Sequence, residues 1–375
     1  MTTQRILLVA GTRPEAIKLA PVVRRLRQEP DLFETTLCVT AQHREMLDRV
    51  LEAFDLRADL DLDLMRPDQT PSDVAARVLE AFDPVLVRLA PGWLIVQGDT
   101  TTAMAASLAA FHRRVRVGHV EAGLRTGDLT RPFPEEMNRR VVDLVAESHF
   151  APTPRAARAL AAEGVPAARI HCTGNTVVDA LLEVARRQGE CPETDSVLIT
   201  AHRRESFGEP LAHVVRAVER LARAFPQTQF LHVSHPNPAV LAAVRRENAP
   251  RNVELLEPLD YPDLLRRLRA CRLVLTDSGG IQEEAPTFGK PVLVLREKTE
   301  RPEAVEAGRA LLVGTDEERI VAEASRLLSD ASARRAMAEG SNPFGDGLAA
   351  SRIADALAGR PYAPFDPATS LAVLA

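Results

Sequence analysis

Short apolar runs alternate with longer amphipathic stretches along almost the whole chain. Runs of four or five apolar residues suit strands buried on both faces, and apolar residues spaced three or four apart suit helices. In the first half this pattern predicts strands at Ile6–Val9, Thr36–Thr40, Trp93–Val96, Val115–His119 and Ser148–Phe150. Between them it predicts helices at Pro14–Arg27, Arg44–Phe54, Pro71–Ala90, Ala103–His112 and Glu135–Val145.

The second half repeats the same alternation. The predicted strands are Val197–Thr200, Gln229–Val233, Val253–Leu256, Leu273–Thr276 and Pro291–Leu295. The predicted helices are Pro210–Ala224, Pro238–Asn248, Tyr261–Ala270, Ile281–Phe288 and Asp316–Leu328. Serial strand–helix units of this kind are typical of parallel sheets with helices on both faces.

We therefore expect an α/β protein with two Rossmann-like, doubly wound domains. The first would comprise residues 1–170 and 355–375, because a final helix at Ala349–Ala358 can return to it, and the second residues 171–354. Ligands bind such sheets beyond the carboxyl ends of the strands. Two sheets that face one another would place that region in a cleft, where we expect the functional site.

Composition narrows the function classes. A chain of 375 residues is too long for one ordinary core, which supports two domains. A net charge of −5 and an aromatic fraction of 4% argue against nucleic acid as a partner. The apolar runs are far shorter than the roughly 20 residues that span a bilayer, and no signal-type apolar core opens the chain. We expect a cytoplasmic protein without a membrane partner.

The four cysteines, at positions 38, 172, 191 and 271, form no CxxC pair. The chain also lacks an HExxH motif, a P-loop with GK[ST] and a GxSxG motif. The absence of these motifs gives no reason to predict a metal site. The turn after the first strand, Gly11–Glu15, is also not the GxGxxG dinucleotide fingerprint.

The segment Asp277–Glu284, DSGGIQEE, lies between a predicted buried strand and a helix. Ser278, Gly279 and Gly280 let backbone N–H groups approach a ligand closely, and a helix N-terminus favours an anion. This combination suits a diphosphate, with a following glutamate placed to reach sugar hydroxyls. The alternative is an ordinary strand–helix turn in which the glycines serve geometry alone.

Polar residues also follow three strands of the first half. Arg13 and Lys18, after the first strand, can reach an anion above the sheet, or can belong to a solvated helix start. Asp99 follows the strand at Trp93–Val96 and is either an N-cap or a catalytic base. Glu121 follows the next strand at a position that does not suit an ordinary core residue.

The next helix begins with two adjacent glutamates. Glu135 and Glu136 follow the proline-rich loop Arg131–Pro134. Besides a functional role, they can simply stabilise the helix start, because a carboxylate in the first turn suits the helix dipole. Nearby, His119 ends an apolar strand, which favours a hydrogen-bonded structural histidine over a base.

Charged loops follow strands of the second half. His202 and Arg203 lie in HRRESFG after Val197–Thr200, which favours an anion site over a surface charge run. His235 follows the next strand and is either structural or ligand-facing. Arg301 lies in a later loop, where it can pair with a carboxylate or a phosphate.

Taken together, these motifs resemble the non-hydrolysing UDP-N-acetylglucosamine (UDP-GlcNAc) 2-epimerases over roughly residues 5–355. The matching segments are GTRPEAIKLAP (Gly11–Pro21), TAQHREMLD (Thr40–Asp48), QGDTTTA (Gln97–Ala103), GHVEAGLRTGD (Gly118–Asp128), PFPEEMNR (Pro132–Arg139), TGNTVVDAL (Thr173–Leu181), HRRESFG (His202–Gly208), DSGGIQEEAP (Asp277–Pro286) and TERPEAVEAG (Thr299–Gly308). Several are long and occur in family order.

The resemblance implies the two-domain arrangement of B-type glycosyltransferases. It implies reversible epimerisation at C2 between UDP-GlcNAc and UDP-N-acetylmannosamine (UDP-ManNAc), by elimination and re-addition of UDP through 2-acetamidoglucal. It implies no NAD, metal or other cofactor, and a homodimer that serves surface polysaccharide or related pathways.

The resemblance also assigns residues. Its pattern places Asp99, Glu121, Glu135 and His202 in the catalytic centre, with Asp99 and Glu121 exchanging the C2 proton. Its substrate-binding positions are Arg13, Lys18, Ser278, Gly279, Gly280, Glu284 and Arg301, with Glu284 for the ribose. Some members bind a second UDP-GlcNAc as an activator, and this region matches at Gln42, His43, Arg203 and His235. Glu45 and Ser206 depart there from the Gln and Asn that other members carry.

Three alternatives share this fold or these motifs. A B-type glycosyltransferase would need an acceptor cleft, often with apolar membrane-facing residues, and the sequence shows no such patch. A hydrolysing 2-epimerase would release free ManNAc and UDP, and the continuous match to the non-hydrolysing motifs disfavours it. A nucleotide-sugar sensor would not need Asp99, Glu121, Glu135 and His202 as proton carriers.

Overall fold

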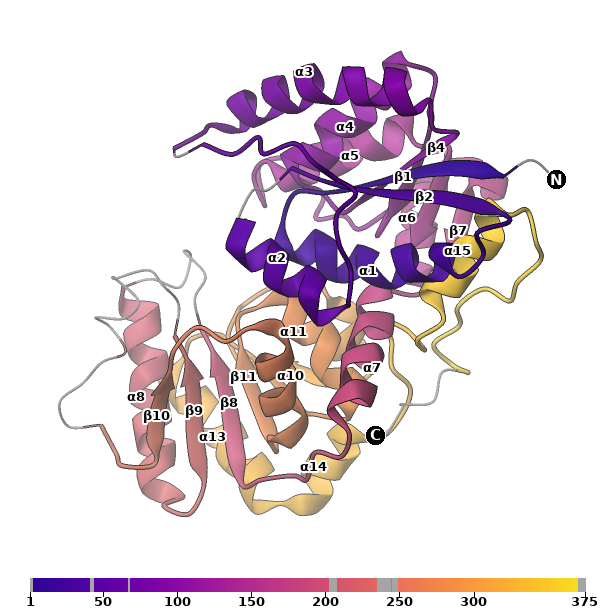
Figure 1. Ribbon diagram of the computed structural model, residues 1–375. Coiled ribbons are helices and arrows are strands. Elements are labelled where there is room, and N and C mark those ends of the chain that lie inside the picture. Colours follow the sequence, from indigo (N-terminus) through magenta and orange to yellow (C-terminus); the bar gives the residue numbers. More distant parts are fainter. Residues whose placement is uncertain are drawn as a thin grey trace. The chain divides into compact units, whose positions relative to one another are not determined.

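The computed structural model describes residues 3–40, 44–66, 68–201, 208–234, 244 and 249–369. The chain forms two compact units (Figure 1). The first unit extends to Leu182 and resumes at Phe344–Pro367, and the second comprises Glu183–Pro343. Each unit contains one parallel sheet with helices around it, which confirms the expected α/β class with two Rossmann-like domains.

The first unit contains a seven-stranded parallel sheet in the order β3-β2-β1-β4-β5-β6-β7. Its strands are β1 (Gln4–Ala10), β2 (Phe33–Val39), β3 (Leu60–Asp61), β4 (Trp93–Gln97), β5 (Arg116–Val120), β6 (Ser148–Ala151) and β7 (Ile170–Cys172). The central strand β1 is buried from Ile6 to Ala10, as expected for an apolar run covered on both faces. β4 and β5 run in register to their ends, where Gln97 lies opposite Val120.

Helices cover both faces of this sheet. The unit contains α1 (Arg13–Arg27), α2 (Arg44–Ala53), α3 (Pro71–Leu89), α4 (Thr101–His112), α5 (Glu135–Val145), α6 (Pro154–Ala162), the 3₁₀ turn η1 (Ala167–Arg169) and α15 (Ala349–Leu357). α3, α4 and α5 pack side by side on one face, and α1, α2 and α15 lie on the other (Figure 1). Among the described residues, no helix is both long enough and apolar enough to cross a membrane.

The second unit has a six-stranded parallel sheet in the order β10-β9-β8-β11-β12-β13. Its strands are β8 (Ser196–Thr200), β9 (Gln229–Val233), β10 (Val253–Leu256), β11 (Leu273–Thr276), β12 (Val292–Val294) and β13 (Ala310–Leu312). Its helices are α8 (Glu209–Ala224), α10 (Tyr261–Ala270), α11 (Gly279–Glu284), η3 (Ala285–Phe288), α12 (Pro302–Glu306), α13 (Glu317–Ser329) and α14 (Ala331–Ala338). The helix predicted at Pro238–Asn248 lies largely outside the described residues.

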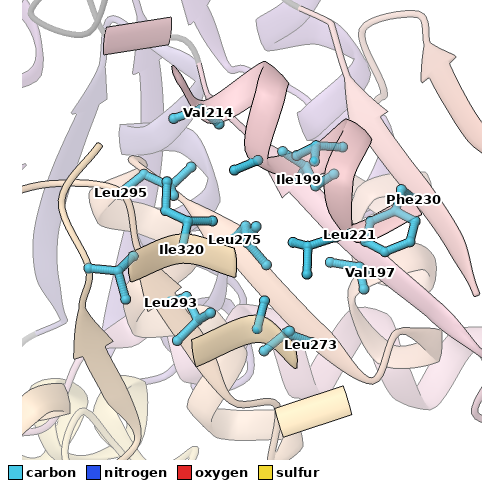
Figure 2. Packing of buried hydrophobic residues seen from close by; sticks show 14 of the residues in the cluster. Val197, Ile199, Val214, Leu221, Phe230, Leu273, Leu275, Leu293, Leu295 and Ile320 are labelled. Atoms are coloured by element: carbon cyan, nitrogen blue, oxygen red, sulfur yellow. The ribbon is translucent and has the colours of Figure 1, made fainter. Parts of the chain in front are cut away.

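The core of the second unit lies between its sheet and the paired helices α8 and α13 (Figure 2). Val197 and Ile199 of β8 and Leu275 of β11 point into it from the sheet, and Leu221 and Ile320 meet them from the helices. The residues between them in β8 and β11 are buried as well, and strands covered on both faces read as short apolar runs in the sequence.

The two compact units divide the chain at 182/183 and 343/344, whereas the predicted boundaries are 170/171 and 354/355. The chain passes from the first unit to the second within the helix α7 (Thr176–Gln188), and it returns to the first unit at Phe344, before α15 begins. The Asp179 carboxylate fixes α15 to the first unit, because it accepts the Ala350 N–H at 2.9 Å and the Ala349 N–H at 3.2 Å. Burial raises the pKa of Asp179 to about 7.

Candidate active site

The turn after β1 is built around a buried carboxylate. Glu15, in the first turn of α1, is 1% exposed, and it accepts the backbone N–H groups of Gly11 at 3.1 Å and Thr12 at 2.7 Å. A side chain at Gly11 would lie 2.8 Å from the Thr102 hydroxyl, so only glycine fits. Arg13, the half-buried first residue of α1, follows directly on this fixed turn.

The end of β4 and the helix α1 both contact Glu121, which follows β5. Its buried carboxylate forms an ion pair with Lys18 of α1 and accepts the Gln97 side-chain N–H at 3.0 Å. Glu121 has a φ of +67°, a left-handed conformation that costs a non-glycine residue roughly 1–3 kcal/mol. The structure thus brings two predicted site residues, Lys18 and Glu121, into contact. It does so with an unfavourable backbone conformation at Glu121.

Asp99 lies on the turn between β4 and α4, and its side chain is 24% exposed. Its carboxylate forms an ion pair with Arg139 of α5, and its main-chain oxygen accepts the Asn138 amide N–H at 3.0 Å. The N-cap of α4 is Thr100, whose hydroxyl accepts the Ala103 N–H at 3.0 Å. The neighbouring Thr100 therefore caps α4, and the Asp99 carboxylate pairs with Arg139 instead of serving as the N-cap.

Glu15 also reaches this second turn, a role that the sequence did not reveal. The Thr100 hydroxyl donates to Glu15 Oε1 at 2.7 Å, which joins the turn after β1 to the turn after β4. Burial raises the pKa of Glu15 to about 7, although its hydrogen bonds act to lower it. The Thr12-x-x-Glu15 capping signature marks its local contact, but the partner 85 positions away in the chain is fixed only by the tertiary fold.

The two glutamates that open α5 occupy different environments. Glu136 is 1% exposed and accepts the backbone N–H groups of Thr126 at 3.1 Å and Gly127 at 3.4 Å, as well as the side chain of Arg140. Glu136 therefore shapes the loop that precedes the helix. Glu135 is half-buried and shares its helix with Asn138 and Arg139, the residues that hold the Asp99 turn.

In the second unit the turn between β11 and α11 combines local contacts with a hydrogen bond from the Asp277 N–H to the Thr200 carbonyl of β8 at 3.1 Å. The Ser278 N–H donates to the Thr276 hydroxyl at 2.9 Å, and the Gln282 side chain donates to the Ser278 carbonyl at 3.2 Å. A Cβ at Gly280 would have no neighbouring atom closer than 3.8 Å, and Gly280 is not among the glycines with positive φ. Neither packing nor backbone conformation requires glycine there, so the protein's own fold does not explain this glycine.

The loop after β12 is tied to α11. Arg301 forms an ion pair with Glu283, and the Thr299 hydroxyl donates to Gln282 at 2.5 Å. Glu284, the last residue of α11, is 7% exposed. The structure therefore gathers Ser278, Gly279, Gly280 and Glu284 on one short segment and connects Arg301 to it through Glu283.

Five predicted residues lie outside the described part of the chain. They are the catalytic candidate His202 and the activator-site candidates Gln42, His43, Arg203 and His235. Within the described ranges, no three His, Cys, Asp or Glu side chains are grouped as a metal site would require.

Comparison with known proteins adds a consistent set of matches. The family model described as UDP-N-acetylglucosamine 2-epimerase matches residues 24–358. A UDP-N-acetylglucosamine 2-epimerase of Yersinia pestis is 48% identical, over 94% of this chain and 98% of its own length.

Two solved structures are similar to the whole chain. The Neisseria meningitidis UDP-GlcNAc 2-epimerase bound to UDP-GlcNAc has a TM-score of 0.89 and 40% identity, over 95% of this chain and 100% of its own. The S. aureus MnaA structure with UDP has a TM-score of 0.87 and 40% identity, over 97% of this chain and 100% of its own.

Proposed function

The chain belongs to the UDP-N-acetylglucosamine 2-epimerases, a family of isomerases, and we propose that it interconverts UDP-GlcNAc and UDP-ManNAc by inverting C2 of the sugar. The observation that carries this proposal is the 48% identity to a relative named for the activity, over 94% of the chain. The similarity to a relative bound to UDP-GlcNAc supports the choice of substrate.

The chemistry of the substrate dictates the route. The C2 hydrogen is not next to a carbonyl, so direct removal of the proton would be too costly. We propose that the C1–O bond to UDP breaks, a base takes the C2 proton and a C1=C2 double bond forms, which gives 2-acetamidoglucal and UDP. A proton then returns to C2 from the opposite face, and the UDP oxygen bonds again to C1. Atoms and electrons balance without an oxidant or a reductant.

This route needs groups that exchange the C2 proton, and the first unit offers two. Asp99 and Glu121 carry out that exchange in our proposal, each paired with a cation, Arg139 and Lys18 respectively. Those pairs hold the carboxylates in defined positions, which proton transfer requires. Glu135, on the helix that positions Asp99, tunes or relays the proton.

The second unit supplies the nucleotide-binding residues in this proposal. The backbone N–H groups of Ser278, Gly279 and Gly280 bind the diphosphate, and the space left open at Gly280 supports a close approach. Glu284 binds the ribose hydroxyls, and Arg301, held by Glu283, contributes positive charge near the phosphates. Arg13 and Lys18 complete the substrate contacts from the first unit.

Several finer points belong to the same proposal. His202 supports the departing diphosphate, and a second UDP-GlcNAc binds as an activator at Gln42, His43, Arg203 and His235. We further propose a cytoplasmic homodimer without a cofactor, whose product feeds the synthesis of surface polysaccharide.

One NMR time course with UDP-GlcNAc as the sole substrate tests the proposal. We expect UDP-ManNAc signals to appear and reach an equilibrium with UDP-GlcNAc. Release of free ManNAc with UDP would identify a hydrolysing enzyme instead, and unchanged UDP-GlcNAc would reject epimerisation. Starting the same experiment from UDP-ManNAc should lead to the same final ratio, because a catalyst does not shift an equilibrium.

A further inference from the structure

His119 connects the helix α5 to the turn that carries Asp99. It lies in β5 with 0% of its surface exposed. Its Nδ1 is 2.6 Å from a carboxylate oxygen of Asp143 on α5, and its Nε2 is 2.8 Å from the main-chain oxygen of Gly98. Gly98 immediately precedes Asp99, so the imidazole contacts the backbone next to a proposed catalytic residue.

Both partners of the His119 ring act as hydrogen-bond acceptors. A backbone carbonyl carries no hydrogen, and the second Asp143 oxygen already accepts the Arg125 guanidinium at 2.7 Å. Burial acts to raise the pKa of Asp143, but the charges and hydrogen bonds of His119 and Arg125 lower it to about 2. Two acceptors require a hydrogen on each ring nitrogen. A neutral ring would leave one buried contact without a hydrogen, which costs about 1–3 kcal/mol.

The surrounding charges support an imidazolium. Arg125 donates to Asp143 and also to Glu163, at 2.7–2.8 Å, so one guanidinium faces two carboxylates. A positive His119 balances the second carboxylate. The other nearby histidine, His149 of β6, points its Nε2 at the Asp143 main-chain oxygen at 2.9 Å, and burial lowers its pKa.

The Gly98 carbonyl is one of several points at which β5 and α5 hold this turn. Gly98 has a φ of +71°, and its N–H donates to Val120 of β5 at 3.0 Å. Asn138 holds the Asp99 main-chain oxygen and Arg139 its carboxylate. The His119 contact fixes the peptide plane between Gly98 and Asp99, and this plane sets the direction of the Asp99 side chain.

We propose that His119 is a doubly protonated positioning residue that holds the Gly98 carbonyl and thereby aims the Asp99 carboxylate. This inference rests on the proposed function, because it takes Asp99 as a proton carrier. With both N–H groups engaged, His119 is not itself a proton carrier in the reaction.

Two amide variants separate the two contacts of the ring. His119→Gln can place its amide N–H near the position of Nε2, so it keeps a donor for Gly98 and gives up the contact to Asp143. His119→Asn places its amide near Nδ1 and does the reverse. We expect His119→Asn to lower kcat by about a hundredfold, as a misplaced catalytic group does, while UDP still binds. The kcat of His119→Gln should fall clearly less than that of His119→Asn. Equal losses, or a more active Asn variant, would overturn positioning through Gly98.

NMR tests the charge without reference to turnover. In protein labelled with ¹⁵N in its histidines, the His119 ring signals can be identified by their loss in either variant. They should show a hydrogen on both ring nitrogens. A bare ring nitrogen would overturn the proposal in the wild-type protein, whether or not a variant folds.

Hydrogen exchange separates this inference from the proposed function. The Gly98 N–H should exchange faster in His119→Asn than in His119→Gln, because only the former releases the turn; equal rates would contradict the proposed hold on Gly98. If Asp99→Asn retained full turnover, the catalytic role of Asp99 would fail, and with it the aim assigned to His119. The NMR and exchange results would still decide the charge of His119 and its hold on Gly98.

Discussion

The turn after β4 and the turn after β11 occupy equivalent places in the two units and are held by different kinds of contact. Each follows the strand next to the first strand of its unit, β1 or β8, at the point where the strand order reverses. The β4 turn is held by side chains of α1, α5 and β5. The β11 turn is held by Thr276 and Gln282 close by in the chain, by the Asp277 N–H that donates to the Thr200 carbonyl of β8, and by contacts of α11 with the loop after β12.

The difference shows how one scaffold position can serve two kinds of chemistry. A carboxylate that exchanges a proton must be aimed, and Asp99 is fixed through Arg139, Asn138 and the Gly98 carbonyl. A diphosphate has several equivalent oxygens, so in our proposal it is bound by backbone N–H groups, and Gly280 adds no side chain between them and the ligand. In our proposal, corresponding positions in the two parallel sheets therefore support a turn for proton transfer and a turn for anion binding.

Removing the Asp99 charge should give the largest difference between an effect on turnover and an effect on UDP binding. We expect Asp99→Asn to lower kcat by about 10²–10⁴-fold, the range for loss of a general acid or base, with UDP affinity retained. Steady-state turnover and titration calorimetry with UDP would measure the two effects. Near-normal turnover would remove Asp99 from proton transfer, and lost UDP binding would show that the two turns are not functionally distinct.

The Glu15 carboxyl, which ties the β4 turn to the β1 turn, should make stability depend on pH. Its pKa rises from 4.5 in the unfolded chain to about 7 in the folded one, so the folded state binds more protons between these values. Its contribution is fully present below pH 4.5 and is lost as the pH rises through about 7. The loss is on the order of 3 kcal/mol. Urea unfolding at several pH values should show a flatter dependence in Glu15→Gln than in the wild type.

Asp179→Asn is the matched control for this effect. Burial raises the pKa of Asp179 from 3.8 to about 7, so this variant should also flatten the pH dependence of stability. Asp179 holds α15 rather than either turn, so its variant should keep kcat, whereas Glu15→Gln should lower it. Equal kcat values in the two variants would argue against a role for Glu15 in positioning Asp99.

A methyl group at Gly280 should affect the β11 turn alone. The added Cβ has room within the protein, so Gly280→Ala should fold with unchanged stability. It would intrude on the proposed diphosphate and weaken UDP binding by about 1–3 kcal/mol, roughly fivefold to 150-fold. Gly98→Ala gives the opposite control, because its Cβ is also unobstructed but its φ of +71° makes the substitution destabilising. Unchanged UDP affinity in Gly280→Ala would contradict the proposed binding mode.

The adjacent glutamates of α5 offer the smallest and most local test. Glu136→Gln should cost about 1–3 kcal/mol of stability, because a buried acceptor of backbone N–H groups becomes part donor. Glu135→Gln should leave the unfolding free energy nearly unchanged and lower kcat. Measuring both quantities in both variants checks the assignment, and the reverse pattern would exchange the structural and catalytic roles.

Periodicity in the sequence predicts the central strands well, but it misses the helices α6 and α7 and the short strands β3, β7 and β13. The core strands β1, β4, β8 and β11 are apolar runs bounded by polar turns, and their predicted positions agree closely with the structure. Short strands such as β3 and β13 are two or three residues long. Their pairing depends on the neighbouring strand rather than on their own pattern, so periodicity does not detect them.

The candidate site shows the same division. Glycine turns and strand-end carboxylates are visible in the sequence because their positions follow from the alternation of strands and helices. Contacts between distant turns are not, and Glu15 with Thr100 and His119 with Asp143 both depend on packing across the sheet. The sequence therefore predicts candidate residues for the chemistry, whereas the structure shows which buried groups contact the turns that carry these candidates.

Isotope exchange at C2 tests the central claim most directly. In deuterated water the wild-type protein should place deuterium at C2 of UDP-ManNAc and, on reversal, of UDP-GlcNAc, and Asp99→Asn should do so far more slowly. Product that retained its original C2 hydrogen would contradict the proposed elimination and the proton-exchange role of the first unit.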